Sequence, residues 1–222
     1  QSRLRPWYEG ERAWVFNAPQ DVLSFSGRRI FGFDMTHILD SEEVRTPALM
    51  YLYHRLEELF TGEPVLIFMD EGWKLLQDPT FSTFIVDKMK TIRKLNGIVG
   101  FGTQSAADIA GAPQSHTLIE QSATNLHFPN PRADEESYMQ RFGLTAKEYA
   151  FIRNTPPERH SFLIQHGADS VIARLDLSAM PDIVKVLSGR KETIEACAVL
   201  RARLGEDPAV WLPEFCGWEP AT

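Results

Sequence analysis

Cysteine, excess positive charge and long apolar runs are all scarce in this sequence of 222 residues. The two cysteines, Cys197 and Cys216, lie in no CxxC or Cys/His cluster, which argues against a zinc motif or a disulfide framework and favours a reducing compartment. The 23 basic and 30 acidic residues give a net charge of −7, which disfavours binding of nucleic acid through bulk charge but leaves a local basic patch possible. No run approaches the roughly 18 apolar residues of a transmembrane helix.

The beginning of the sequence lacks both an initiator methionine and the apolar core of a signal peptide. The first methionine is Met35. We therefore expect the sequence to be a piece of a longer protein. At 43% hydrophobic residues it is apolar enough to form one globular domain, with or without a small appendage.

Strand-like and helix-like segments alternate along the chain, which predicts an α/β fold with a mostly parallel sheet and an antiparallel edge hairpin. The run Val65-Leu66-Ile67-Phe68-Met69 is fully apolar, and we expect it to be a strand buried on both faces. The hairpin is predicted from the Gly167-Ala168-Asp169 turn between two apolar runs. Strands are expected near residues 29–33, 65–69, 98–103, 124–128, 161–166 and 170–176, and helices near 41–60, 80–95, 134–142, 145–152, 181–187 and 191–204.

The strongest functional signal is Asp70-Glu71, which directly follows the apolar run 65–69. This is the Walker B pattern, in which the aspartate holds Mg²⁺, usually through water, and the glutamate orients and deprotonates the attacking water. Ligands of open α/β sheets bind beyond the carboxyl ends of the strands, where these two residues lie. An acidic turn after a buried strand is the alternative interpretation.

A second signal follows the next predicted strand, in Thr103-Gln104-Ser105. The amide of Gln104 would border the same crevice and hydrogen-bond the γ-phosphate or the attacking water, with Thr103 beside it. The alternative is an ordinary helix start, with Thr103 or Ser105 as cap and Gln104 as a solvated first-turn residue.

Four basic residues, Lys88, Lys90, Arg93 and Lys94, crowd the end of the predicted helix 80–95. A solvated helix face with favourable charge for the helix dipole is one interpretation. The functional interpretation is that Arg93 or Lys94 reaches a phosphate bound in a neighbouring subunit, as an arginine finger does. A small nucleic-acid contact is a third, weakly supported by an acidic chain.

The phosphate-binding loop GxxxxGK[ST] occurs nowhere in the sequence. Without it nothing in these residues cradles the β- and γ-phosphates of a nucleotide. We expect this loop upstream in a longer protein, or else a degenerate site, and we expect the 222 residues alone to be inactive.

Taken together, the ordered motifs resemble the C-terminal ATPase domain of the CagE/TrbE/VirB family of type IV secretion ATPases. They span most of the chain, and Asp-Glu-x-Trp-Lys-Leu-Leu followed by Arg-Lys-x-Asn-Gly and Thr-Gln-Ser is the most specific part. The motifs are Phe31-Gly32-Phe33-Asp34-Met35-Thr36, Tyr51-Leu52-Tyr53-His54-Arg55, Phe68-Met69-Asp70-Glu71-Gly72-Trp73-Lys74-Leu75-Leu76, Lys90-Thr91-Ile92-Arg93-Lys94-Leu95-Asn96-Gly97, Thr103-Gln104-Ser105, Phe128-Pro129-Asn130-Pro131, Arg141-Phe142-Gly143-Leu144-Thr145 and Leu187-Ser188-Gly189.

The resemblance implies a RecA-like P-loop NTPase fold, ATP and Mg²⁺ as ligands, and a homo-hexamer at the cytoplasmic side of the bacterial inner membrane. It also implies partners among the other inner-membrane and ATPase subunits of a secretion system. By position, Asp70 resembles the metal-linked aspartate, Glu71 the catalytic glutamate and Gln104 the γ-phosphate sensor, while Arg93 and Lys94 match a basic motif that acts in trans. The expected organisation is an irregular segment over residues 1–26, an ATPase core over 27–190, and a C-terminal helix with an aromatic tail over 191–222.

Three functional hypotheses follow. The first is the ATP-hydrolysing motor of a type IV secretion system, which powers pilus biogenesis and substrate translocation. The second is a conjugative coupling ATPase that pumps DNA, and it shares the same fold and site. The third is a non-catalytic docking module that binds partner subunits through the aromatic tail, residues 211–218; the alternative for that tail is packing against its own domain.

Overall fold

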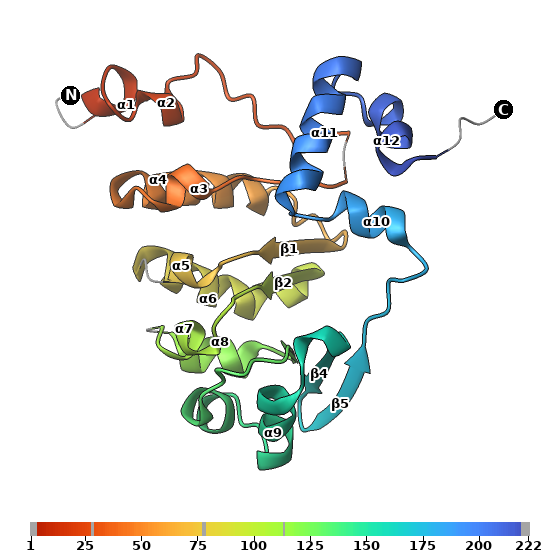
Figure 1. The fold of residues 1–222 in the computed structure, drawn as a ribbon. Helices are drawn as coiled ribbons and strands as arrows, with labels where there is room; N and C mark the ends of the chain where they lie inside the picture. Colours follow the sequence, from red (N-terminus) through yellow and green to blue (C-terminus); the bar gives the residue numbers. More distant parts are fainter. Residues whose placement is uncertain (1–3, 28, 77–78, 113, 219–222) are drawn as a thin grey trace.

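The computed structural model describes residues 4–27, 29–76, 79–112 and 114–218, except the side chains of Trp73, Lys74, Thr80, Phe84, Lys90 and Arg93. Helices and strands alternate in the central part of the chain, as Figure 1 shows. The α/β class predicted from the sequence is therefore confirmed. No helix in this described part is both long and apolar enough to cross a membrane.

The centre of the fold is a parallel pair of strands, β1 (Val65–Met69) and β2 (Gly97–Phe101). The crossover between them contains α5 (Trp73–Leu76), α6 (Pro79–Ile92) and the 3₁₀ turn η1 (Arg93–Leu95). Parallel neighbours require such a crossover, because a tight turn cannot return the chain to the same end of the sheet. Both strands therefore end at the same edge.

One face of this pair is covered by α6 and by α4 (Glu42–Glu57). Leu49 and Tyr53 of α4 and Phe81 and Ile85 of α6 are almost fully buried and pack in one cluster with Met69. Each such side chain contributes about 1.5–3 kcal/mol by leaving water. Packing in this cluster fixes the position and direction of β1, and therefore the position of Asp70 and Glu71, which follow the strand.

The expectation that residues 65–69 are buried on both faces is wrong. Successive side chains of a strand point to opposite faces, and α4 and α6 cover only the face that carries Ile67 and Met69. Leu66 and Phe68 on the other face are exposed.

A second sheet is antiparallel and contains β3 (Thr124–His127), β4 (Ser161–His166) and β5 (Asp169–Arg174). The predicted hairpin is β4–β5, and Gly167 in its turn has φ +57°, which glycine adopts without strain. The hairpin does not lie at the edge of the β1–β2 sheet: β3–β5 form a sheet of their own. Short helices connect and flank these strands: α7 (Ala106–Ala110), α8 (Ser115–Gln121), the π-helix η2 (Glu136–Arg141), α9 (Ala146–Asn154) and the 3₁₀ turn η3 (Pro157–Arg159).

The predicted strand near residues 29–33 is also wrong. Residues 29–35 form neither helix nor strand. The aromatic residues of this run instead contact a neighbouring loop, because Phe31 and Phe33 pack edge-on against Phe25 at ring distances of 5.0 and 6.3 Å. Further upstream, α1 (Arg5–Tyr8) and α2 (Ala13–Phe16) are single turns, and α3 (Thr36–Leu39) leads into α4.

The last three helices are α10 (Pro181–Val186), α11 (Lys191–Leu204) and α12 (Pro208–Cys216). Figure 1 shows α11 and α12 at the end of the molecule opposite the β4–β5 hairpin and α9. The aromatic tail packs on its own chain: Phe215 is buried, and the indole of Trp218 donates a hydrogen bond to Asp182 of α10 at 2.6 Å. This packing agrees with the alternative to a docking tail.

Candidate functional site at the ends of β1 and β2

The loops after β1 and β2 are joined by their backbones. The strand register pairs Met69 with Phe101. Beyond it, the Gly102 amide donates to the Met69 carbonyl at 2.8 Å, and the Gly72 amide donates to the Gly102 carbonyl at 3.3 Å. The two segments with the strongest sequence signals, 70–71 and 103–105, therefore lie side by side at one edge of the sheet.

The side chains of Glu71 and Gln104 meet across this edge. The amide nitrogen Nε2 of Gln104 donates a hydrogen bond to Oε1 of Glu71 at 2.5 Å. The sequence signals at the two residues are separate, yet both predict action on the same water, and the structure brings the two side chains together. Gln104 precedes α7, so it is not the first-turn residue of the alternative interpretation.

Glu71 holds a backbone conformation that is unusual for its residue type. Its φ is +51°, in the left-handed region that costs roughly 1–2 kcal/mol for a residue other than glycine. Strained backbone of this kind is concentrated at functional sites. The turn directs the Glu71 side chain toward Gln104, and the amide of Glu71 donates to Oδ1 of Asp70 at 3.1 Å.

Two glycines allow these loops to approach, and neither was predicted as part of the site. A Cβ atom on Gly102 would lie 2.9 Å from Oδ1 of Asp70, and one on Gly72 would lie 2.7 Å from the ring of Phe101. Both distances are closer than real Cβ contacts. The available signal was the position of each glycine, one directly after Glu71 and the other directly after the second strand.

Thr103 is exposed beside Gln104, and its hydroxyl takes part in the local turn. Its Oγ1 donates to the Ser105 carbonyl at 3.1 Å and accepts from the Ser105 amide at 3.2 Å. Thr103 therefore shapes the loop before α7, while Ser105 takes the N-cap position of that helix without a side-chain cap hydrogen bond.

The basic residues lie at the other end of β2. Lys94 belongs to η1, which precedes the first residue of β2, whereas Gln104 follows its last. A five-residue strand separates the two ends by about 15 Å. Lys94 is therefore not brought to the Glu71–Gln104 pair within one chain; Lys88 forms an ion pair with Glu57, and the side chain of Arg93 lies outside the described residues.

The residues at this edge fit a magnesium ion better than a softer metal. Asp70 offers an exposed carboxylate, and Thr103 a hydroxyl, and Mg²⁺ binds hard oxygen ligands through one or two carboxylates plus water and phosphate oxygens. No group of three or more His, Cys, Asp or Glu suited to a metal occurs among the described residues.

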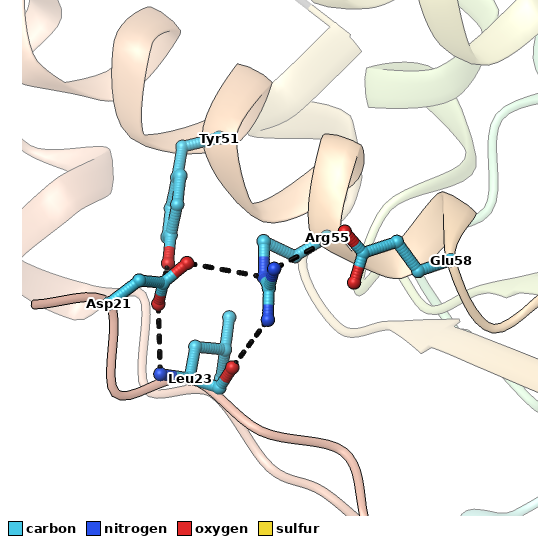
Figure 2. A network of polar contacts seen from close by, with 5 residues as sticks. All are labelled: Asp21, Leu23, Tyr51, Arg55 and Glu58. Carbon is cyan, nitrogen blue, oxygen red and sulfur yellow. Dashed lines mark hydrogen bonds and ion pairs between the residues drawn. The ribbon is translucent and has the colours of Figure 1, made fainter.

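The sequence motif Tyr51–Arg55 has a structural role in α4 (Figure 2). Tyr51 donates to Oδ1 of Asp21 at 2.5 Å, and Arg55 donates to the Leu23 carbonyl at 2.6 Å and pairs with Asp21 at 3.4 Å. The hydrogen bond from Tyr51 is the main reason that the pKa of Asp21 is lowered. These contacts hold residues 21–23 against α4, a role that no sequence pattern indicates.

Comparisons with known proteins point to the same family. No family model matches the chain. The type IV secretion system protein virB4 of Bartonella henselae is 42% identical over 215 residues, 96% of this chain and 27% of that protein. The protein PtlC of the type IV secretion system of Bordetella pertussis is 41% identical over 206 residues, 91% of this chain and 25% of that protein. The chain thus spans about a quarter of the length of these curated relatives.

Among solved structures, VirB4 of Thermoanaerobacter pseudethanolicus superposes with a TM-score of 0.59 and 21% sequence identity, over 78% of this chain and 48% of that one. At this identity the likeness concerns the fold, and it supports the predicted RecA-like α/β class. The resemblance to the type IV secretion family is confirmed by the sequence relatives. Over nearly its whole length, the chain is similar to the VirB4 and PtlC proteins of type IV secretion systems.

Proposed function

We propose that this segment supplies the carboxylate half of an ATP-hydrolysis site in the motor of a type IV secretion system. The observation that carries the proposal is the 2.5 Å contact of Gln104 with Glu71, next to Asp70, where two parallel strands end. The similarity to virB4 proteins supports the choice of system.

In the proposed reaction Glu71 is the general base. Its carboxylate accepts a proton from a water molecule as that water attacks the γ-phosphorus and the bond to the bridging oxygen of the leaving ADP breaks. Gln104 orients both the carboxylate and the water. Asp70 would hold Mg²⁺ through water, and the bound ion would neutralise charge on the phosphate oxygens. A positioned general base of this kind contributes about 10²–10⁴-fold to the rate.

The remaining half of the site lies outside these residues in our proposal. The sequence holds no GxxxxGK[ST] loop, so we place the phosphate cradle elsewhere in a longer protein and expect the 222 residues alone to be inactive. Because Lys94 lies at the far end of β2, Arg93 or Lys94 would serve a nucleotide held by a neighbouring subunit. That arrangement requires an oligomer, and we propose a homo-hexamer at the cytoplasmic face of the inner membrane, in contact with other subunits of the secretion system.

The test is Mg-ATP hydrolysis by the longer protein that carries this segment, compared with its Glu71→Gln and Glu63→Gln variants. Glu71→Gln should lose at least about 100-fold in rate and retain ATP binding, whereas Glu63→Gln, in the loop before β1, should match the wild type. Turnover by Glu71→Gln near the wild-type rate contradicts the proposal. Stimulation by DNA identifies a coupling ATPase instead, and no hydrolysis by a folded oligomer identifies a docking module.

The role in trans has its own test. Arg93→Ala should lose activity, and mixing it with Glu71→Gln subunits, which retain Arg93, should restore part of it, since some interfaces then combine an intact Glu71 with an intact Arg93. Mixed oligomers with no activity above that of either variant alone would contradict action between subunits.

A further inference from the structure

One face of the β1–β2 sheet is apolar and open. Leu66 is 69% exposed, Phe68 66% and Ile98 66%. The register pairs Leu66 with Ile98 and Phe68 with Gly100, so the three side chains share one face. We call these three residues the open face.

The opposite face of the same two strands is packed against helices. Ile67, Met69, Val99 and Phe101 pack in the cluster formed with α4 and α6. The contrast between the faces therefore does not come from loose packing of the strands. It arises because the described chain supplies helices to one side of this sheet.

The second sheet shows a weaker contrast, because Ile172 of β5, which pairs with the buried Leu163, is itself 55% exposed. Leu163 of β4 is buried at 2% exposure on one face, whereas Leu126 of β3 and Val171 of β5 are 53% and 58% exposed. The register pairs Ile164 with both Leu126 and Val171, which places them on the face opposite Leu163. The β1–β2 sheet, which helices cover on one side only, is typical of a three-layer α/β fold from which one layer is absent.

The composition of β1 and β2 is that of buried strands. Their ten residues, VLIFM and GIVGF, include no charged side chain and no proline, the devices that protect exposed strands from association. Parallel strands occur almost only with both faces covered. The open face is therefore an interface.

The geometry of Phe68 makes the open face smooth enough to receive a helix. Its ring lies over the neighbouring strand, because a Cβ on Gly100 would be 2.8 Å from Cδ2 and one on Gly102 would be 3.3 Å from Cζ of the Phe68 ring. Because the Phe68 ring lies against Gly100 and Gly102, it projects little from the sheet, and the apolar surface next to Asp70 is shallow. Flat apolar sheet faces are the surfaces on which α-helices pack in layered α/β folds.

The length of the relatives indicates what covers this face. The chain corresponds to 27% of the virB4 protein that it matches over nearly its whole length. We propose that the open face packs against an apolar helical segment of the same polypeptide, outside residues 1–222. This inference goes beyond the proposed function and does not depend on ATP hydrolysis.

The test compares cysteine labelling in the 222-residue chain and in the longer protein that carries it. Both start from Cys197→Ser and Cys216→Ser, and each receives Ile98→Cys, or Leu66→Cys as a second probe. A maleimide should label these thiols at least tenfold more slowly in the longer protein. The control Glu63→Cys, in an exposed loop, should react equally in both, and circular dichroism verifies that each variant is folded.

Two results would overturn the proposal. Equal labelling of Ile98→Cys and Leu66→Cys in both proteins would show that no segment of the longer protein covers the face. Protection in the 222-residue chain that grows with its concentration, together with a dimer in sedimentation, would assign the face to a second copy instead.

Discussion

Gln104 and Glu71 are 33 residues apart in the sequence, and the amide of one donates to the carboxylate of the other at 2.5 Å. Neither residue is placed by its own helix or strand alone. The pairing of Met69 with Phe101 brings the two loops to one edge, and the left-handed turn at Glu71 aims its carboxylate. The contact between Gln104 and Glu71 therefore forms only when both loops of the proposed site are correctly placed.

The first prediction concerns Gln104. Gln104→Ala should lower kcat of the longer protein by about tenfold or more, because the general base loses the group that orients it. Gln104→Glu places a carboxylate against Glu71, and like charges at this distance favour a shared proton. The acidic limb of its pH–rate profile should therefore move to higher pH. A profile identical to that of the wild type would show that the contact has no part in hydrolysis.

The second prediction concerns Gly102. In Gly102→Ala the new Cβ would lie 2.9 Å from Oδ1 of Asp70 and must displace that carboxylate. We expect a higher Mg²⁺ concentration for half-maximal ATPase activity and little change in stability, because Oδ1 is the end of an exposed side chain that can turn away. The matched control is Gly189→Ala, whose Cβ would meet no atom within 4 Å. An unchanged Mg²⁺ dependence would mean that Asp70 does not act through the metal.

The third prediction concerns pH and His127. This imidazole is buried between Tyr138 and Phe142, and burial lowers its pKa below the ordinary 6.5. On acidification the unfolded chain takes up the proton first, so the stabilising effect is complete above pH 6.5 and is lost as the pH falls through the folded-state pKa. The free energy of unfolding should decrease by up to about 1.4 kcal/mol per pH unit from this group.

Chemical denaturation of the 222-residue chain between pH 7.5 and 5.5 measures this effect. The slope should become smaller in His127→Gln and remain in the control His37→Gln, since His37 is exposed on α3. Asp134 and Asp176 have lowered pKa values and so contribute at more acidic pH. Equal slopes in both variants would exclude His127 as the source.

The fourth prediction concerns the contacts between residues 21–23 and α4. Arg55→Ala removes both the hydrogen bond to the Leu23 carbonyl and the ion pair with Asp21. Losing about 1 kcal/mol of local stability should raise the rate of thermolysin cleavage near residue 23 about fivefold. Arg5→Ala, which removes only the exposed pair with Glu9, is the control. Cleavage at the same rate in both variants would show that Arg55 does not restrain this segment.

Much of the fold was predictable because its signals are local. The apolar run 65–69, the helix 80–95 and the hairpin turn at Gly167 are each specified by residues within a few positions of one another. The capping box of α9, in which Thr145 and Glu148 satisfy each other's backbone amides, is local in the same way. The misplaced strand at 29–33 shows the limit, because its aromatic side chains find partners in Phe25 rather than in a neighbouring strand.

The residue types of the candidate site could be predicted from the sequence, but the way in which they come together could not. Asp70, Glu71 and Gln104 were identified because they come soon after apolar runs. The role of Gly102 depends instead on how closely two loops approach each other across the sheet. The contacts of Asp21 with Tyr51 and Arg55 link residues about 30 positions apart, and no local sequence pattern predicts such contacts.

The sequence by itself determined the main strands and the longest helices, the acidic strand end and the resemblance to the family, because periodicity, apolar runs and ordered motifs lie in consecutive residues. Only the tertiary structure decided that Gln104 contacts Glu71, that Lys94 lies at the far end of β2, and that one face of β1 and β2 is open. The reason is physical. Strand pairing and helix packing depend on contacts between distant residues, and burial of a strand depends on which layers of the fold are present to cover it.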